Sequence, residues 1–389
     1  LGPPSVAARG DPMPHGECKT QGGKLVAVDL DIVDGRLANV RVRGDFFVYP
    51  ESAAESTMAA LAAGLVGTPA DTDVLALAAR ARAAIPFGVE LLGTSPDAIA
   101  VAVRRAITGD ADWGTAPPLP RIGSFTEAEI DGHTAAWKSL PWRLLPERPA
   151  APALNVALDE VLTDRVAAGL SPPTLRFWRW TAPAVILGRC QSVVNEVDAA
   201  EAEAMGVQIV RRMTGGGAMF LQPHGAITYS IYLPETALAG LSIRQSYEVC
   251  ESWVIRGMRH LGVDAHHVPI NDIACSEGKI GGAAQARRKG VVLHHTTIAY
   301  DMDPGDMVRV LRIGREKLKD KAVASAAKRV SPLVRQTGKP RAEIVDHLFA
   351  SFRKRFGGTT DELTAEELTA ADRLVESKYG HSAWTNEFE

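Results

Sequence analysis

The chain has few cysteines and no long apolar run. Its four cysteines, at positions 18, 190, 250 and 275, show no C-x-x-C spacing, which excludes the common zinc and redox motifs. Their number and spacing favour reduced thiols in a cytoplasmic protein over a disulfide framework. No uninterrupted apolar run approaches the roughly 18 residues that a membrane span needs. We therefore expect a cytoplasmic protein without membrane association.

The charges nearly cancel. The chain carries 43 basic and 46 acidic residues, a formal net charge of −3. This balance argues against an overall electrostatic attraction to nucleic acid. Hydrophobic residues make up 46% and charged residues 23%, as in ordinary globular proteins. Because single cores rarely grow past about 250–300 residues, the length of 389 residues predicts two domains.

Composition shifts mark the domain boundaries. Residues 1–16 are rich in proline, glycine and alanine near their start and lack the apolar core of a signal peptide, which predicts a flexible leader with Met13 as a candidate natural start. A first domain is predicted over 17–108. Proline and glycine then mark a linker over 109–130, and a larger domain fills 131–389.

Residue periodicity predicts a hairpin in the first domain and mixed strands and helices in the second. The predicted elements are strands over 24–33 and 37–43 joined at Asp34-Gly35, helices near 51–66, 71–85 and 95–107, a helix near 154–168, strands near 174–179 and 184–187, a helix near 196–204, strands over 207–211 and 227–233, a helix over 246–261, strands over 271–275, 279–285 and 291–301, and a mostly helical end. This pattern alone is typical of an α/β or an α+β fold.

Two segments combine glycine with positive charge. The first, 211–217, reads Arg-Arg-Met-Thr-Gly-Gly-Gly, and the second, 271–285, carries Lys279 in a turn of small residues. Glycine lets backbone N–H groups approach a phosphate, because it tolerates positive φ and has no Cβ. Arginine and lysine supply the charge that a nucleotide and a carboxylate both need. Together the segments suggest a carboxylic acid that is activated by ATP and held as an adenylate.

The same segments carry a family resemblance. The runs Arg-Arg-x-Thr-Gly-Gly-Gly-Ala-x-Phe from 211, Asn-Asp at 271–272, Lys-Ile-Gly-Gly-x-Ala-Gln-x-Arg from 279 and Leu-His-His-x-Thr from 293 resemble those of lipoate–protein ligases. The resemblance covers about residues 131–389. It implies an α+β catalytic domain of the biotin/lipoate ligase and class II synthetase type, with a mixed central sheet flanked by helices. Residues 17–108 resemble the small α+β accessory domain that these ligases usually carry at the C-terminus.

The resemblance also implies the site. Lys279 is the expected catalytic residue and would contact the lipoate carboxylate and the α-phosphate, and Asp272 is the expected Mg²⁺ ligand. The residues expected to bind substrate or adenylate are Arg212, Arg211, Thr214, Gly215, Gly216, Gly217, Ala218, Asn271, Gly281, Gly282 and His295.

Several assignments keep an alternative. Adjacent residues of a strand point to opposite faces, so only one of His294 and His295 is expected to face the ligand. Arg211 is an alternative candidate for structural pairing. Tyr229, Val185 and Ile186 are candidates for an acyl tunnel wall or for plain core. The basic residues Arg312, Arg315, Lys317, Lys319 and Lys321 would meet an acidic acceptor or form a solvated helix face.

The implied reaction uses ATP and Mg²⁺ to convert lipoate to lipoyl-AMP. The lipoyl group then passes to a lysine of an acceptor protein, either the E2 lipoyl domain of a 2-oxoacid dehydrogenase or a glycine-cleavage H-type protein. The accessory domain would assist adenylation. One departure is Leu221-Gln222, where the family often has His-Asp, with His224 nearby. The alternatives are an octanoyl or lipoyl transferase that uses Cys190 or Cys275 and an acyl carrier protein donor, and a catalytically inactive acyl-binding homologue.

Overall fold

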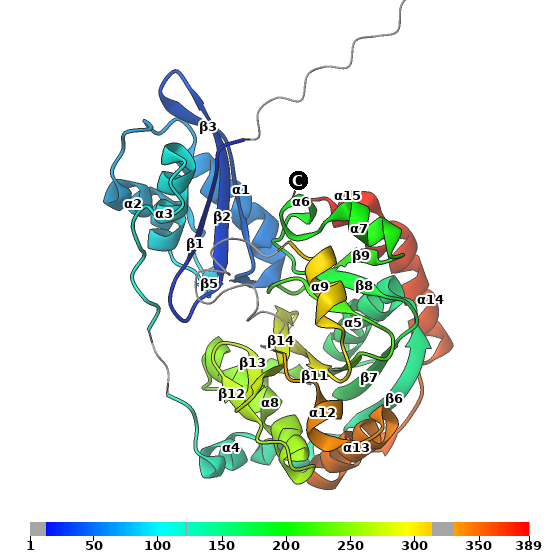
Figure 1. Cartoon of the computed structure of the whole chain (residues 1–389). Helices are drawn as coiled ribbons and strands as arrows, with labels where there is room; N and C mark the ends of the chain where they lie inside the picture. Colours follow the sequence, from blue (N-terminus) through cyan, green and yellow to red (C-terminus); the bar gives the residue numbers. More distant parts are fainter. Residues whose placement is uncertain (1–12, 121–122, 313–329, 389) are drawn as a thin grey trace, which may run out of the picture.

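The computed structural model describes residues 13–120, 123–312 and 330–388, which form two parts that lie side by side (Figure 1). We call residues 13–120 the N-terminal part and the rest the C-terminal part. Residues 109–120 follow the last helix of the N-terminal part and run along one side of the molecule (Figure 1). Most of the predicted leader and the basic stretch after Arg312 lie outside the described residues.

The N-terminal part is an antiparallel sheet, β1-β2-β3, with helices packed against it and a short second sheet, β4-β5. The predicted hairpin is confirmed, since Asp34 and Gly35 take φ of 50° and 71° between β2 and β3. β1 starts inside the range predicted as leader. The elements are β1 (His15–Lys19), β2 (Leu25–Val33), β3 (Arg36–Gly44), β4 (Phe47–Tyr49), η1 (Glu51–Ala53), α1 (Ala54–Leu65), α2 (Val74–Ala84), β5 (Glu90–Leu92) and α3 (Pro96–Thr108).

The C-terminal part begins at a short helix and alternates strands with helices. Its described elements are α4 (Glu127–His133), η2 (Ala135–Ser139), β6 (Arg143–Ala150), α5 (Pro152–Ala167), β7 (Thr174–Trp180), β8 (Ala184–Leu187), α6 (Val193–Glu196), α7 (Ala199–Ala204), β9 (Gln208–Arg211), β10 (Met219–Leu221), β11 (Ala226–Pro234), η3 (Glu235–Leu238), α8 (Ile243–His260), β12 (His266–Val268), β13 (Asp272–Cys275), β14 (Gly278–Arg288), β15 (Val291–Ala299), α9 (Pro304–Val310), α12 (Leu333–Thr337), α13 (Arg341–Phe356), β16 (Thr359–Thr360), α14 (Ala365–Leu374), η4 (Val375–Tyr379) and α15 (Ser382–Thr385).

A mixed sheet with the order β12-β13-β14-β15-β11-β7-β6-β16 forms the centre of the described C-terminal part. Side chains alternate along its strands, so each strand feeds two cores. Phe177 and Tyr229 pack with Trp253 of α8 and with α13 on one face. Trp178 belongs to the core formed with α5 and α14 on the other face. The predicted α+β fold with helices on both faces of a mixed sheet is confirmed.

Two of the differences from the sequence prediction have a local cause. The helix expected near 196–204 is two short helices, because Val197 is extended and Asp198 starts α7 by accepting a hydrogen bond from the Glu201 N–H. Strand β6 was not predicted. It contains Pro146 and Pro149, which lack an N–H donor, and its pairing with β7 shifts register between Leu145 and Arg148.

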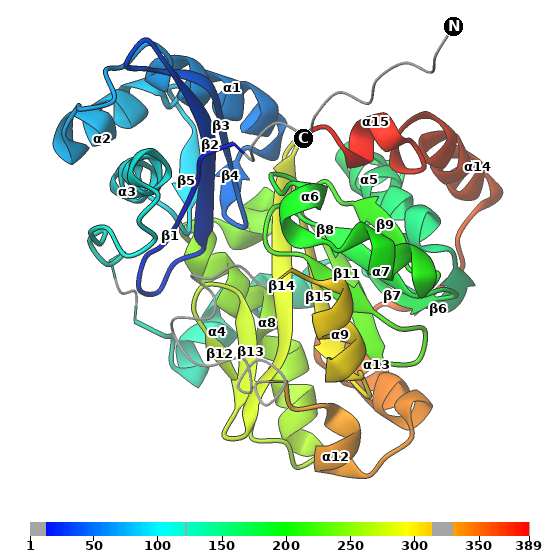
Figure 2. The same ribbon diagram turned by 45° about the horizontal axis from the view of Figure 1, so that its top comes forward.

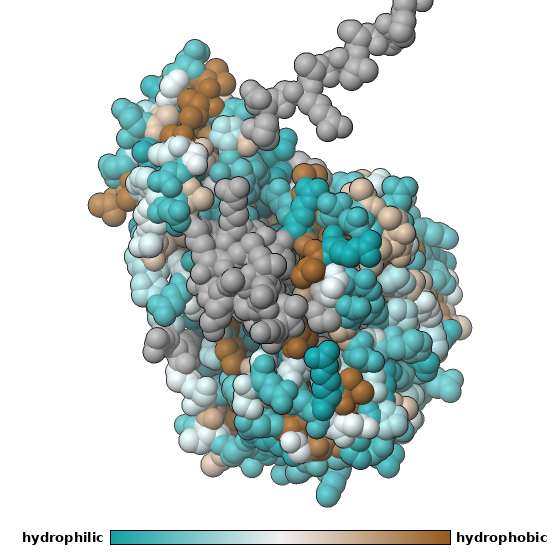
Figure 3. All heavy atoms as spheres, in the orientation of Figure 1, coloured by the Kyte–Doolittle hydropathy of each residue, from teal (hydrophilic) through white to brown (hydrophobic). Residues whose placement is uncertain are grey.

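Polar residues cover much of the face shown in Figure 3, and the hydrophobic residues on that face form small, separate patches. Scattered apolar residues of this kind are normal on a globular surface. None of the helices in the described residues is both long enough and apolar enough to span a membrane.

β14 runs along the boundary between the two parts in both ribbon views (Figure 2). A closed hydrogen-bond ring joins the parts there. The Gln285 N–H donates to the Tyr247 hydroxyl over 2.9 Å, the hydroxyls of Tyr247 and Tyr49 lie 2.9 Å apart, and the Tyr49 hydroxyl donates to the Gln285 carbonyl over 3.2 Å. If Tyr247 donates to Tyr49, every proton of the ring has an acceptor. The Glu51 carboxylate also accepts the Arg287 N–H over 2.8 Å.

We expect Tyr49→Phe to loosen this junction. The variant leaves the Gln285 carbonyl and the Tyr247 hydroxyl without their buried partner, which costs about 1–3 kcal/mol. Hydrogen–deuterium exchange should become faster in both β4 and β14. Tyr300→Phe removes a hydroxyl that donates to the Lys339 carbonyl over 3.1 Å within the C-terminal part, and it serves as the control. Equal exchange at β4 and β14 in Tyr49→Phe and in the wild type would contradict the prediction.

Candidate functional site

A cavity of about 260 Å³ lies where the sheet of the C-terminal part meets the N-terminal part. Both parts contribute to its wall, which combines apolar side chains with three cationic ones. Its lining residues are Lys24, Asp45, Trp178, Trp180, Ile186, Arg212, Gly216, Gly217, Ala218, Met219, Leu221, Thr228, Asn271, Lys279, Gly282, Ala283, Ala284, His295 and Thr297.

The glycine turn forms one side of this cavity. β8, β9 and β10 form a small sheet in the described part, and the turn connects β9 to β10. Gly188, which directly follows β8, lies so close to the turn that a Cβ on it would be 1.8 Å from the Gly216 carbonyl oxygen. Gly216 has φ of 91°, which side chains disfavour. On its other side a Cβ at Gly215 would lie 2.9 Å from the Phe46 carbonyl oxygen. Glycine therefore allows the turn to contact Gly188 on one side and Phe46 of the N-terminal part on the other.

Arg212 stabilises the conformation of the turn through hydrogen bonds to backbone carbonyls. Its guanidinium donates to the carbonyls of Gly215 over 2.6 Å, Gly217 over 3.0 Å and Ile186 over 2.9 Å. Burial lowers the pKa of Arg212 to about 10, still well above neutrality. Its partners in the described residues are uncharged, so no carboxylate neutralises it. The turn thus presents a buried positive charge to the cavity, which favours an anionic ligand.

Lys279 provides a second cation opposite the turn. Its ammonium donates to the Asp272 carboxylate over 2.9 Å and remains half-exposed. Burial raises the pKa of the Asp272 carboxyl, but Lys279 and then Lys24 outweigh burial and lower it overall. A Cβ at Gly282 would lie 3.1 Å from the Lys279 ammonium. A side chain at position 282 would therefore crowd the Lys279 ammonium, and glycine avoids this.

A buried relay connects the turn to the sheet. The Thr214 hydroxyl accepts from Arg212 Nε over 2.9 Å and lies 2.9 Å from His295 Nε2. His295 Nδ1 lies 2.7 Å from the Asp159 carboxylate, which also accepts from the Ser230 hydroxyl over 2.9 Å. A carboxylate only accepts, so Nδ1 carries the proton and Nε2 accepts from Thr214. The relay fixes the orientation of the imidazole at the cavity wall.

The structure brings most of the predicted site residues together. Arg212, Gly216, Gly217, Ala218, Asn271, Lys279, Gly282 and His295 line the cavity. Gly281 lines an adjacent apolar cavity of about 180 Å³, and Asp272 lines a larger cavity on the other side. Thr214 is buried behind the wall, and Gly215 contacts the N-terminal part.

Arg211 does not line the cavity. Its fully buried guanidinium donates to the Gly188 carbonyl over 3.0 Å and to the Trp384 carbonyl over 3.1 Å. It ties the turn to the C-terminal tail, where Arg189 also pairs with Glu387 at 2.6 Å. The alternation of neighbouring side chains along an extended segment is the signal that only one arginine would face the ligand.

Other predicted residues take separate places. Ile186 lines the cavity, whereas Tyr229 and Val185 are fully buried in the cores. His294 lies on the opposite strand face to His295. Where the family pattern has His-Asp, Leu221 is part of the cavity wall and Gln222 accepts the Asp303 N–H over 3.1 Å at the start of α9.

Sequence reasoning missed several lining residues, among them two tryptophans, one lysine and one aspartate. Trp178 and Trp180 follow the two-residue period of β7, which places both on the cavity face. Lys24 and Asp45 come from the N-terminal part. Gly22-Gly23 precedes Lys24, and Gly44-Asp45 lies at the end of β3. Glycines at strand ends are common, so they indicated a binding site only weakly.

The cysteines do not line this cavity. Cys190 is 1% exposed in the core of the N-terminal part, and burial raises its pKa to about 11. Burial also raises the pKa of Cys250. Cys275 is buried in the core beside α8, and Cys18 lines the larger cavity. A thiol with a raised pKa is a poor nucleophile because little thiolate forms.

We expect His294 to make stability fall as the pH falls. Burial lowers the pKa of His294 well below 6.5, and Gln285 Nε2 lies 3.0 Å from its Nδ1, which fits a neutral ring. Below pH 6.5, His294 therefore binds a proton in the unfolded chain but not in the folded chain. Stability should be complete above this pH and decline by about 1.4 kcal/mol per pH unit below it. His294→Gln should flatten this decline in urea denaturation series between about pH 5 and 6.5, and identical slopes would contradict it.

Sequence comparison finds relatives named octanoyltransferase LipM. Octanoyltransferase LipM of Symbiobacterium thermophilum is 33% identical over 62% of this chain and 97% of its own length. Octanoyltransferase LipM of Kyrpidia tusciae is 32% identical over the same shares.

Solved structures give a second comparison. A bi-partite lipoate protein ligase of Thermoplasma acidophilum matches with a TM-score of 0.57 and 29% identity, over 64% of this chain and 96% of its own. A lipoate-protein ligase A bound with ATP matches with a TM-score of 0.55 and 26% identity, over 64% and 99%. The family model described as the lipoyl protein ligase A/B catalytic domain matches residues 151–353. The chain therefore belongs to the lipoyl protein ligase A/B family.

Proposed function

We propose that this protein is an ATP-dependent lipoate–protein ligase, which activates lipoate to lipoyl-AMP and transfers the lipoyl group to an acceptor lysine. The observation that carries the proposal is one cavity that combines an apolar wall with Arg212 and Lys279, and whose described lining contains no cysteine. An acyl chain with a carboxylate matches the apolar wall and the cations. Activation of a carboxylate by a nucleotide needs no nucleophile from the enzyme, which agrees with a described lining that contains no cysteine.

The wall suggests how the acyl group is held. Trp178 and Trp180 donate their indole N–H groups to Ser230 over 2.8 Å and to Thr228 over 3.1 Å. Because these bonds satisfy the polar edges inside the protein, the rings offer apolar surface to the acyl chain. The carboxylate then lies toward Lys279 at the other end of the cavity.

The first step forms an acyl phosphate anhydride. A carboxylate oxygen of lipoate attacks the α-phosphorus of ATP, the bond from that phosphorus to the β-phosphate oxygen breaks, and pyrophosphate leaves with the electron pair. Lys279 offsets the repulsion between the two anions and stabilises charge as it develops. Arg212 adds a fixed charge that needs no reorganisation, because four hydrogen bonds already hold its guanidinium.

The second step transfers the acyl group. The neutral amine of an acceptor lysine attacks the acyl carbon, AMP leaves with the electron pair of the anhydride bond, and the amine loses one proton. A lipoyl domain of a 2-oxoacid dehydrogenase or a glycine-cleavage H-type protein is the proposed acceptor. The Thermoplasma ligase is described together with its E2 lipoyl domain, which supports this class of partner.

Mg²⁺ is the proposed metal, and it would arrive with ATP. The described residues contain no group of three or more His, Cys, Asp or Glu side chains placed to hold an ion. Mg²⁺ in nucleotide sites is commonly held by one or two carboxylates together with substrate phosphates. Asp272 fits that need and would be the protein ligand, and the ion would neutralise phosphate charge.

An octanoyl or lipoyl transferase is the second candidate. The names of the relatives at 32–33% identity favour it. Such a reaction through a thioester requires an accessible thiolate near the acyl chain. Cys190 and Cys275, the candidates from the sequence, are both buried away from the cavity wall, which supports the ligase instead.

We expect pyrophosphate release from ATP–Mg²⁺ to require lipoate and to end in a lipoylated acceptor domain. Lys279→Ala should lower lipoate-dependent release by about 10²–10³-fold, the usual cost of one group that stabilises transition-state charge. A coupled phosphate assay measures release, and mass spectrometry measures the acceptor. Lys138→Ala, a surface lysine of η2, is the control. Release without lipoate, or none in the wild type, would refute the proposed ligase.

Removing the candidate thiols should leave ligation intact. The double variant Cys190→Ala, Cys275→Ala retains Lys279 and Arg212, so its rate of acceptor lipoylation from lipoate and ATP should stay within about threefold of wild type. The same samples are tested with an octanoyl carrier protein and without ATP. Acyl transfer that the wild type performs from the carrier and the double variant has lost would favour the transferase.

A further inference from the structure

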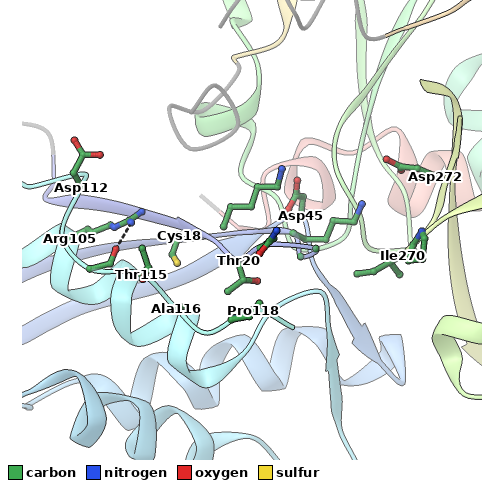
Figure 4. A pocket seen from close by; sticks show the side chains of 17 residues that line it. Cys18, Thr20, Asp45, Arg105, Asp112, Thr115, Ala116, Pro118, Ile270 and Asp272 are labelled. Atoms are coloured by element: carbon green, nitrogen blue, oxygen red, sulfur yellow. Dashed lines mark hydrogen bonds between the residues drawn. The ribbon is translucent and has the colours of Figure 1, made fainter. Parts of the chain in front are cut away.

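A second and larger cavity of about 820 Å³ adjoins the site, and Lys24 lines both cavities. The N-terminal part supplies most of the larger cavity's wall. Figure 4 shows Ile270 and Asp272 near one end, Asp45 in the middle, and Arg105 and Asp112 toward the other end. The end near Asp272 is also the end near Lys279, because those two side chains are paired at 2.9 Å. The two cavities therefore meet at a charged boundary.

The stem of Lys24 is held firmly at this boundary. Its backbone N–H donates to the Gly93 carbonyl over 2.6 Å, and a Cβ at Gly93 would lie 2.7 Å from Lys24 Cγ. The next residue, Leu25, donates its N–H to the Asp45 carboxylate. The direction of the side chain is thus set by the fold of the N-terminal part.

The ammonium of Lys24 has no hydrogen bond or ion pair with any described residue. Burial lowers the pKa of Lys24, the Asp272 and Asp45 carboxylates counteract the effect, and Lys279 adds to it. Asp272 already pairs with Lys279. Asp45 also lines both cavities, but it accepts the Leu25 N–H, so both wall carboxylates already bond another group of the protein. A half-buried cation in such surroundings is stabilised by an anion from outside. The cavity shape leaves room for such an anion.

We propose that Lys24 binds the β- and γ-phosphates of ATP and stabilises pyrophosphate as it leaves. The inference rests on the proposed ligase function. Lys279 faces the junction of carboxylate and α-phosphate, and the acyl chain occupies the tryptophan side. The remaining phosphates then extend past Asp272 toward the larger, more polar cavity, where Lys24 stands.

The chemistry of the first step favours a cation beside the departing pyrophosphate. Breakage of the bond between the α-phosphorus and its bridging oxygen leaves the electron pair on pyrophosphate, so negative charge grows there and no proton is needed. A lysine is a common phosphate ligand that acts as a point charge. Lys24 would make the N-terminal part a direct participant in adenylation, while the later attack of the acceptor lysine involves neither pyrophosphate nor Lys24.

The test separates the two half-reactions. Lys24→Met keeps the apolar stem and removes the charge, Lys24→Arg keeps the charge, and Arg80→Ala removes an exposed cation of α2 as the matched control. Each full-length variant is assayed for lipoate-dependent pyrophosphate release from ATP–Mg²⁺ and for transfer from supplied lipoyl-AMP to a lipoyl domain. Inhibition of ATP-dependent release by added inorganic pyrophosphate is measured as well.

Lys24→Met should lower pyrophosphate release about a hundredfold and weaken inhibition by pyrophosphate, with transfer from lipoyl-AMP within about twofold of wild type. Lys24→Arg should recover part of the release, and Arg80→Ala should match wild type. Wild-type release in Lys24→Met would overturn the proposal, as would an equal loss in both half-reactions. A wild-type protein that never releases pyrophosphate would refute the ligase function itself, a result distinguishable from failure of Lys24 alone.

Discussion

The backbone of Gly216 lies so close to Gly188 that no side chain fits between them, and the rest of the site depends on this contact. It brings the glycine turn against the end of β8 and leaves the other side of the turn open to Phe46 and Phe47 of the N-terminal part. Arg212 can then reach three carbonyls of the turn and its surroundings. A side chain at either glycine would separate the layers and move the arginine away from the cavity.

Buried polar groups transmit this arrangement to the central sheet. Arg212 contacts Thr214, Thr214 contacts His295, and His295 contacts Asp159 of α5. Each member has a partner, which is the condition under which a buried network makes a structure rigid instead of destabilising it. The Arg212 guanidinium is thereby held in place before any ligand arrives, as electrostatic stabilisation of a transition state requires.

The N-terminal part belongs to this site as much as the central sheet does. The closed hydrogen-bond ring of Tyr49, Tyr247 and Gln285 holds the N-terminal part against β14. The Gly44 N–H adds a second link, because it donates to the Cys190 carbonyl over 3.1 Å. Lys24 and Asp45 consequently enter the cavity wall. The proposed role of Lys24 would give the N-terminal part a direct function in adenylation.

The sequence by itself determined the Asp34-Gly35 hairpin, because turn chemistry and strand alternation are local properties. The resemblance of its motifs indicated the family, the α+β class and less than half of the cavity wall. It also placed Lys279 in the site. Only the tertiary structure decided that Arg212 faces the cavity while Arg211 clamps the tail, that Asp159 supports His295, and that Lys24 joins Lys279. These relations join residues far apart in the chain, and they depend on how the sheets, the tail and the N-terminal part pack together, which no local pattern encodes.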